Sequence, residues 1–192
     1  IKLPGSIDMP AIIHALQRHL PADAVLTNGA GNFASWLHRF YRYTGLAKGH
    51  KTQLAPTNGA MGYGVPAGIA ANLVSGRTAF TIAGYGDFLM NGQELATATG
   101  YGAGKLISVV VDNGTYGTIR MHQEKHYPGR ISATHLQNPD FAAYARAFGG
   151  HGERVESTDQ FAAAFERAVA SGKPAIVHCL IDPEAITPTT TI

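Results

Sequence analysis

Short apolar runs alternate along the chain with stretches in which apolar side chains recur at helical spacing. The apolar runs lie at residues 24–27, 78–83, 106–111 and 175–181, and residues 153–156 are expected to form a further short strand. Uninterrupted runs of this length are typical of strands that are buried on both faces of a parallel sheet. The alternation predicts an α/β fold: a doubly wound, mainly parallel sheet of about five or six strands with helices on both faces.

Helix boundaries are also marked in the sequence. Asp8 or Ser6 can cap a first helix, which carries Pro10 in its first turn. Residues 138–140 start a later helix, and residues 157–159 cap the one after it. These boundaries place helices before and between the predicted strands, as the alternating pattern requires.

Two segments carry neither pattern. Residues 41–57 are polar and aromatic and predict a long loop. Residues 183–192 are rich in Pro and Thr and predict a tail that is loose or packs on a neighbour. One domain is therefore expected over residues 1–192, with residues 183–192 as its tail.

Composition and charge change this picture little. The chain has 192 residues, enough for a sizeable core, and its net charge is only +2. No long basic run, membrane span or signal peptide is visible, so we expect a cytoplasmic protein without a nucleic-acid or membrane partner. The single cysteine, Cys179, lies in an apolar run and is expected to be a buried structural thiol. The first residue is Ile1, which favours a piece of a longer protein.

The most informative stretch is residues 77–117. Its first predicted strand runs into a glycine turn at residues 84–86, and a helical stretch follows from about Gly92 to Tyr101. The second predicted strand ends in the polar residues 112–114. Open parallel sheets bind ligands at the carboxyl ends of their strands, and glycines let the backbone approach a phosphate. The stretch therefore predicts a ligand site at this edge of the sheet.

Two further glycine segments have the same form. Residues 28–33 follow the strand at 24–27, and residues 58–67 precede an Ala-rich helix. The first segment is either part of a ligand site or a turn that only reverses the chain. Met61 in the second is either a contact for a ligand or filler of the core.

At residues 84–113 the sequence resembles the thiamine-diphosphate motif, Gly-Asp-Gly followed about 25 residues later by Asn-Asn. Residues 84–86 stand in the first place, 25 residues (87–111) follow, and Asp112-Asn113 stands in the second place. Residues 88–90 and 93–95 resemble the acetolactate synthase branch of the family, and the match extends over nearly all of the chain. The resemblance implies the C-terminal cofactor-binding domain of a three-domain subunit.

The resemblance also implies a set of cofactor contacts. In the family, the turn at residues 31–33 faces the diphosphate, the Gly59 carbonyl accepts from the aminopyrimidine, and Met61 wedges the cofactor into a bent shape. Magnesium is ligated by Asn113, by the Thr115 carbonyl and by the residue at the position of Tyr85. The implied cofactor-binding residues are Gly31, Asn32, Phe33, Gly59, Ala60, Met61, Gly84, Gly86, Asp87, Phe88, Asn113, Thr115, Tyr116 and Gly117.

The chain departs from the family at the metal. Tyr85 replaces the usual Asp ligand, and a neutral phenol is a poor ligand for a hard cation. Sliding the register by two residues makes Gly86-Asp87 the metal turn, but it places Phe88 where a glycine belongs and shortens the gap to 23 residues. In the favoured first register Tyr85 is an altered metal site, a sequence error or an engineered change. Acidity at Asp112, which replaces the first Asn, could partly offset it.

Three positions on the next helix bear on the substrate. Ile119 falls where many simple decarboxylases carry a glutamate, and an apolar residue there resembles acetolactate synthases. His122 falls where those enzymes have a tryptophan that favours larger acceptors, which leaves the substrate pair open. His122 and His126 have the spacing of metal ligands, but without a third ligand solvated side chains are expected.

The resemblance implies an enzyme that decarboxylates a 2-ketoacid and then ligates or protonates the enamine, with thiamine diphosphate and Mg²⁺ as cofactors. The activating glutamate comes from another domain, usually on another subunit. No catalytic residue is therefore assignable in this chain, which is expected to be incomplete alone and to act in a homo-oligomer.

Three alternatives stay open. One is the cofactor-binding subunit of a two-chain 2-ketoacid decarboxylase. Another is a non-catalytic domain that lost metal binding through Tyr85. The third, a nucleotide-binding α/β domain, lacks a complete Gly-x-Gly-x-x-Gly fingerprint and a Gly-Lys-Ser/Thr phosphate loop.

Overall fold

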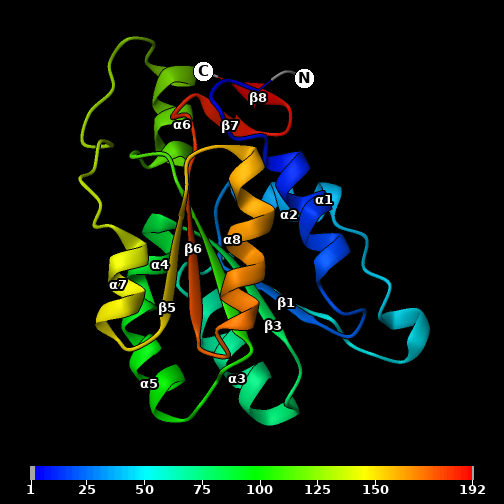
Figure 1. The fold of residues 1–192 in the computed structure, drawn as a ribbon. Helices are drawn as coiled ribbons and strands as arrows, with labels where there is room; N and C mark the ends of the chain where they lie inside the picture. The colour runs from blue at the N-terminus through cyan, green and yellow to red at the C-terminus, as the bar shows by residue number, and fades with distance from the viewer. Residues whose placement is uncertain (1–2, 192) are drawn as a thin grey trace.

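A computed structural model describes residues 3–191 of the chain. Six parallel strands form one sheet in the order β2-β1-β3-β4-β6-β5 (Figure 1). The strands are β1 Val25–Asn28, β2 Gln53–Leu54, β3 Ala79–Gly84, β4 Leu106–Asp112, β5 His151–Val155 and β6 Ala175–Leu180. This arrangement confirms the predicted α/β fold.

Helices cover both faces of the sheet because the central strands are apolar on both sides. One face of β3, β4 and β6 packs in a core cluster with α1, α2 and α8, and the other packs with α3, α4, α5 and α7. The bounds of the helices are α1 Met9–His19, α2 Ala34–Phe40, α3 Gly64–Ser75, α4 Tyr85–Asn91, α5 Leu95–Gly100, α6 Gly117–His126, α7 Phe141–Ala147 and α8 Thr158–Ala170, with short 3₁₀ turns η1 Leu46–Lys48 and η2 Gly92–Glu94.

The strand order reverses beside β1. The chain leaves β1 toward the edge strand β2 and returns to β3 on the other side of β1. Such a switch point opens a crevice at the carboxyl ends of the two central strands. The fold therefore directs the turns after β1 and β3 to one place.

Two element predictions were wrong. The predicted loop at residues 41–57 contains η1 and strand β2, which pairs with β1 through Leu26 and Gln53. The strand is two residues long and exposed, so no apolar run announced it. The helical stretch after β3 begins at Tyr85 instead of near Gly92, because β3 runs into α4 without an intervening turn.

The tail prediction also needs correction. Strands β7 (Ala185–Thr187) and β8 (Thr190–Thr191) form an antiparallel hairpin, and Ala185 and Ile186 are buried in their own chain. Figure 1 shows the hairpin at the same end of the molecule as α6. The segment is therefore part of the domain through residue 191; residue 192 lies outside the described residues.

Cap signals in the sequence identified two helix starts correctly. The Asp8 carboxylate accepts from the Ala11 amide, and the Asp140 carboxylate accepts from the amides of Ala142 and Ala143. Ser157 occupies the cap position of α8, but its hydroxyl donates to Asp159 instead of capping the backbone.

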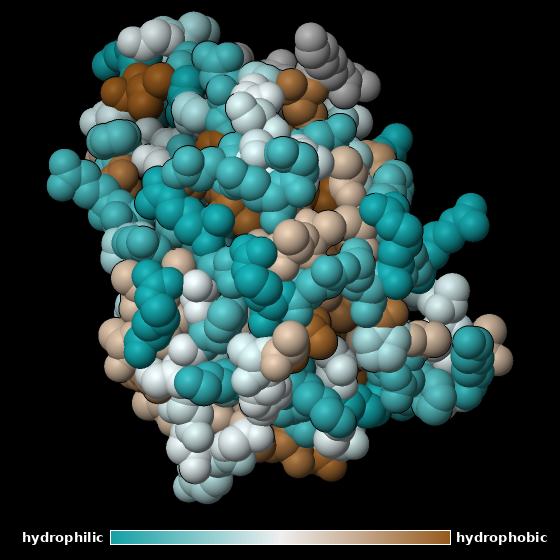
Figure 2. Space-filling view, viewed as in Figure 1, coloured by the Kyte–Doolittle hydropathy of each residue, from teal (hydrophilic) through white to brown (hydrophobic). Residues whose placement is uncertain are grey.

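The surface and the single thiol agree with the composition. Figure 2 shows mostly hydrophilic side chains on the viewed face, with scattered hydrophobic residues between them. Among the described helices, none has both the length and the apolar character needed to cross a membrane. Cys179 is buried, as predicted, and burial raises the pKa of its thiol to about 12.

Candidate functional site

A cavity of about 320 Å³ lies at the carboxyl edge of the sheet, where segments that are far apart in the sequence meet. The turn after β1, the segment before α3, the start of α4 and the loop after β4 form its wall. The C-terminal hairpin contributes a further side. The lining residues are Ala30, Gly31, Asn32, Phe33, Trp36, Gly59, Met61, Gly84, Tyr85, Gly86, Asp87, Val111, Asn113, Thr115, Tyr116, Gly117, Thr118, Ile119, Ile181, Ala185 and Ile186.

The structure brings the predicted site residues together, with two exceptions. Ala60 is exposed and does not line the cavity, although its neighbours Gly59 and Met61 do. Phe88 is fully buried in the core below α4, where its ring meets Phe141 edge-on at 5.3 Å between centroids. The prediction of Phe88 as a cofactor contact is therefore wrong, because its side chain points into the core.

Several lining residues were missed in the sequence. Trp36 carried the pattern of a core residue of α2, and it is buried as well as adjacent to the cavity. Ile181, Ala185 and Ile186 come from the end of β6 and from the hairpin, which the sequence did not predict. The adjacent apolar residues Ala185 and Ile186 were a signal, but the Pro/Thr content of the segment obscured it.

Glycine is required at two positions of the wall because aromatic rings lie directly against the backbone. A Cβ atom on Gly84 would lie 2.7 Å from the Phe33 ring, and one on Gly86 would lie 2.7 Å from the Tyr116 ring. Larger residues would displace these rings. The two glycines therefore allow the turn after β1 and the loop after β4 to close on α4.

Further hydrogen bonds join the segments of the wall. The Asn32 amide donates to the Thr118 hydroxyl at 3.3 Å, which links the turn after β1 to the start of α6. The Thr115 hydroxyl donates to the Thr134 carbonyl at 3.0 Å, and Thr115 also forms a β-bridge with His135. The loop after β4 is thus held from both sides.

Asp87 lines the cavity and connects two of the glycine segments. Its Oδ1 atom accepts from the Gly62 amide at 2.7 Å, while Oδ2 is buried without a partner. Burial raises the pKa of Asp87 to about 6, although the amides of Gly62 and Ala30 act in the opposite direction. A buried carboxylate that touches both loops fixes their separation.

At the predicted metal position, Tyr85 is only 3% exposed. Its ring stacks on Tyr116 with 6.1 Å between centroids, and its hydroxyl has no hydrogen-bond partner. Burial, with smaller contributions from Asp112 and Tyr116, raises the pKa of the Tyr85 phenol, so it stays neutral at physiological pH. A neutral, buried phenol offers Mg²⁺ no carboxylate-like oxygen.

Asp112 does not compensate for Tyr85. Its Oδ1 accepts from the Gly114 amide at 2.9 Å and from Asn138 at 2.7 Å, and its Oδ2 bonds to His178 Nε2 at 3.0 Å. Burial acts to raise the pKa of Asp112, but the hydrogen bonds from His178, Gly114 and Asn138 outweigh it and lower that pKa. Both oxygens are therefore committed within the protein.

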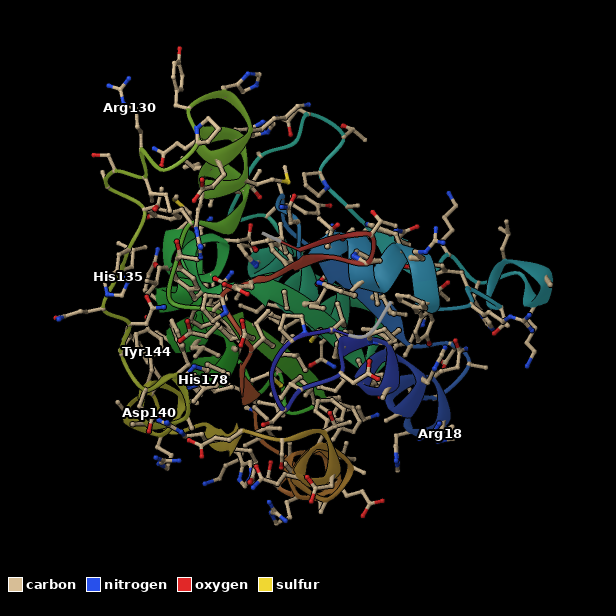
Figure 3. The ribbon with its side chains drawn as sticks, turned by 90° about the horizontal axis from the view of Figure 1, so that it is seen from above. Arg18, Arg130, His135, Asp140, Tyr144 and His178 are labelled. Atoms are coloured by element: carbon tan, nitrogen blue, oxygen red, sulfur yellow. The ribbon has the colours of Figure 1, made fainter. Side chains whose placement is uncertain are left out.

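His178 belongs to a buried network at the carboxyl end of β4. Figure 3 shows it close to Asp140 and Tyr144, and its Nδ1 accepts from the Phe141 amide at 3.3 Å. With Nδ1 accepting, Nε2 carries the proton and donates to Asp112. This network joins β4, β6 and α7 and directs the Asp112 carboxylate toward α7.

The remaining predicted metal ligands are neutral. The Asn113 side-chain oxygen accepts from the Thr115 amide at 3.3 Å, and Thr115 could contribute only its carbonyl. Within residues 3–191, no three His, Cys, Asp or Glu side chains are grouped as a metal site. The side chains at this end of the cavity therefore do not fit Mg²⁺.

The histidines of α6 show no metal site either. The rings of His122 and His126 stack with 6.4 Å between centroids, and the described residues supply no third ligand beside them. Ile119, one turn before His122, lines the cavity and is half exposed. The helix thus presents an apolar residue to the cavity.

A family model described as "Thiamine pyrophosphate enzyme, C-terminal TPP binding domain" matches residues 29–179. This range covers most of the chain and contains the glycine segments that line the cavity. The chain belongs to this family. The family match confirms the resemblance that residues 84–113 suggested, and we use the term TPP-binding domain from here on.

Sequence relatives of the TPP-binding domain include acetolactate synthases. The chain is 34% identical over 189 residues to the acetolactate synthase isozyme 2 large subunit of Escherichia coli K12, covering 93% of this chain and 32% of the relative. It is 30% identical over 184 residues to a probable acetolactate synthase large subunit of Methanocaldococcus jannaschii, covering 94% of this chain and 30% of the relative. The chain thus spans about a third of the length of these relatives.

Solved structures share the fold of the TPP-binding domain. Benzoylformate decarboxylase from Polynucleobacter necessarius superimposes with a TM-score of 0.81 at 21% identity, covering 94% of this chain and 34% of that one. A thiamine diphosphate-dependent 4-hydroxybenzoylformate decarboxylase from Rhodococcus jostii RHA1 superimposes with a TM-score of 0.83 at 22% identity, covering 95% of this chain and 34% of that one.

The groups that line the cavity fall into two sets. The apolar side chains Phe33, Met61 and Ile186, with the backbone of the glycine segments, fit the organic part of thiamine diphosphate. The end marked by Tyr85 and Asn113 does not fit the metal.

Proposed function

We propose that the cavity holds thiamine diphosphate and that the chain is the cofactor-binding part of a larger acetolactate synthase-like enzyme. The substrate proposed for that enzyme is a 2-ketoacid, which it decarboxylates before ligation or protonation. The observation that carries the proposal is the convergence of the glycine segments on one cavity within the range matched by the family model. The acetolactate synthase relatives support placing that enzyme in the acetolactate synthase branch of the family.

When bound, thiamine diphosphate supplies the carbon nucleophile and the electron sink that decarboxylation needs. The residues of this chain bind and orient it. Following the family resemblance, we assign the Gly59 carbonyl and Met61, which both line the cavity, to the aminopyrimidine. We assign the backbone at Gly31, Gly84 and Gly86 to the diphosphate.

The remaining parts of the enzyme lie outside this chain. No residue of the described cavity can serve as the activating glutamate: its only carboxylate, Asp87, is tied to the backbone of Gly62. We propose that missing N-terminal domains or a partner subunit supply that glutamate. We also propose that the enzyme is a homo-oligomer in the cytoplasm. The chain spans about a third of the length of its relatives, which agrees with one domain of the family's three-domain subunit.

Two other functions keep specific support. A non-catalytic domain is favoured by Tyr85, whose neutral phenol lies at the metal position. A cofactor-binding subunit of a two-chain 2-ketoacid decarboxylase is supported by the fold that this chain shares with two decarboxylase structures. A measurement of cofactor binding distinguishes the non-catalytic domain from the proposal. The coding sequence upstream of residue 1 distinguishes the two-chain subunit from it.

Binding can be followed through Trp36, which is the only tryptophan and lines the cavity. We expect thiamine diphosphate to change its fluorescence in a saturable way. Gly84→Val should weaken binding, because its side chain would meet Phe33 in the wall. Val74→Ala, a control at an 88% exposed residue outside the cavity, should bind normally. Absence of saturable binding by the wild-type chain, with or without Mg²⁺, would reject the proposal for this chain.

A further inference from the structure

We infer that this chain holds no divalent cation at the diphosphate end of the cavity, because the Tyr85–Tyr116 aromatic pair occupies that place. Ligand binding in the cavity is then independent of Mg²⁺. This inference rests on the proposed function, since it concerns how the same cavity takes its cofactor. Four observations lead to it, on Tyr85, on Asp112, on Asp87 and on the remaining oxygen atoms.

The Tyr85 side chain is part of the hydrophobic core. It is the first residue of α4, it belongs to the core cluster on one face of the sheet, and its ring lies 6.1 Å from that of Tyr116. The Tyr116 ring also lies against the backbone of Gly86. The pair is therefore packed against both the core and the backbone of α4, and moving Tyr85 aside would expose apolar surface.

The nearby acid is not available to a cation. Asp112 has three hydrogen bonds, to the Gly114 amide, Asn138 and His178, and it is 5% exposed. Rotating the carboxylate toward the cavity would leave these donors unpaired in the interior. Each such group costs about 1–3 kcal/mol. A metal would have to offset all three costs.

The other acid faces a different part of the cavity. Asp87 Oδ1 bonds to the Gly62 amide and lies so close to Gly29 that a Cβ there would overlap it. This places the carboxylate between the turn after β1 and the segment before α3. Its Oδ2 is buried in the described structure, so a cation in the cavity does not reach it unless the wall moves. The alternative register, with Asp87 as the metal ligand, is therefore not supported by the geometry.

What is left for a cation is one amide oxygen and one carbonyl. Asn113 and Thr115 supply these, and both are neutral. Mg²⁺ in proteins is usually held through one or two carboxylates in addition to phosphate oxygens and water. A ligand in this cavity must therefore be held by backbone and neutral groups.

Metal binding can be measured directly with Mn²⁺, whose free form gives a strong electron paramagnetic resonance signal. We would titrate Mn²⁺ into the wild-type chain, Tyr85→Asp and Tyr85→Phe, each with and without thiamine diphosphate. The wild type and Tyr85→Phe should leave Mn²⁺ free. Tyr85→Asp should take up one equivalent in the presence of the cofactor.

A parallel titration of thiamine diphosphate, in excess Mg²⁺ or in EDTA, keeps the test valid if Tyr85→Asp does not fold. The wild-type Kd should agree within about twofold between the two conditions. The Kd of a folded Tyr85→Asp should be at least about tenfold lower with Mg²⁺.

The outcomes separate the inference from the proposed function. Stoichiometric Mn²⁺ uptake by the wild type, or cofactor binding that EDTA abolishes, overturns the inference and leaves the proposed function intact. A folded Tyr85→Asp that binds the cofactor but ignores Mn²⁺ also overturns it, because position 85 is then not the metal position. If the wild type binds no cofactor in either condition, the proposed function fails, and Mn²⁺ uptake by Tyr85→Asp alone still supports the inference.

Discussion

At the scale of single residues, the hydroxyl of Tyr85 is a polar atom buried without a partner. Removing such a group avoids its desolvation cost, so Tyr85→Phe is expected to raise the free energy of unfolding by about 1 kcal/mol. Urea denaturation of both proteins measures the change. Tyr127→Phe, at a 62% exposed residue, should be neutral. A clear loss of stability in Tyr85→Phe would show that the hydroxyl has a partner in solution.

Asp87 gives the second prediction at this scale. Its pKa is raised from 3.8 to about 6, so the folded state binds this proton more tightly than the unfolded state. The free energy of unfolding should therefore fall as pH rises from about 4 to 6, by an amount on the order of 3 kcal/mol. Below pH 4 and above pH 6, Asp87 adds no further pH dependence.

Asp87→Asn should remove this part of the pH profile and be more stable than the wild type at neutral pH. Denaturation between pH 4 and 7 compares the two, and Glu184→Gln, at an exposed residue, is the matched control. An unchanged slope in Asp87→Asn would contradict the assignment of the pH dependence to this carboxyl.

Ala133 is the described non-glycine residue with positive φ, at 57°. The left-handed conformation costs an L-residue about 1–2 kcal/mol, and glycine avoids most of it. Ala133→Gly should therefore raise stability by up to about 1 kcal/mol after the entropy of the unfolded chain is counted. Ala163→Gly, on the exposed side of α8, should lower stability by about 1 kcal/mol. A loss of stability in Ala133→Gly as well would mean that this backbone is not strained.

Sequence alone predicted which residues meet at the cavity more successfully than it predicted what each side chain does. Gly84 and Gly86 were identified because their spacing to Asn113 is the motif itself. Phe88 was misassigned because the motif fixes its position along the chain but not the direction of its side chain. The commitment of Asp112 to His178 joins residues 66 positions apart, and no local pattern predicts such a pair.

At the scale of elements, the hairpin β7–β8 closes one side of the cavity. Ile186 is 3% exposed and lines it. Ile186→Ala should lower the free energy of unfolding by about 2 kcal/mol or more and weaken thiamine diphosphate binding, because a buried apolar contact and part of the wall are lost. Thermal denaturation and Trp36 fluorescence measure the two effects. Ile131→Ala, at a half-exposed residue outside the cavity, should change neither, and normal binding by Ile186→Ala would remove the hairpin from the site.

The elements that sequence predicted well have strong internal patterns. Strands β3, β4 and β6 are apolar runs whose residues are almost all buried, so their burial explains their composition. Strand β2 exists because the edge of β1 is free to pair, which is a property of the fold and not of Gln53 and Leu54. The start of α4 was missed because glycines disfavour helix, while packing of Tyr85 and Phe88 in the core outweighs that cost.

At the scale of the whole molecule, the strand order determines where the cavity lies. The reversal beside β1 brings the segments that follow β1 and β3 to the same edge of the sheet, and β4 adds the Asn113 loop there. Among the described residues, one carboxylate, Asp87, lines the cavity, and no glutamate does. The isolated chain is therefore expected to show no steady decarboxylation of 2-ketoacids, including as Tyr85→Asp. Sustained release of carbon dioxide from pyruvate by the purified chain would refute this expectation.

We propose that this cavity holds thiamine diphosphate without a divalent cation. A crystal structure of the chain grown with thiamine diphosphate and Mg²⁺ tests it most directly. We expect cofactor density between Met61 and the loop at Asn113, with the Tyr85 and Tyr116 rings still stacked and no metal beside them. Octahedral density on Asn113 and the Thr115 carbonyl, or a cofactor bound anywhere else on the molecule, would contradict the account.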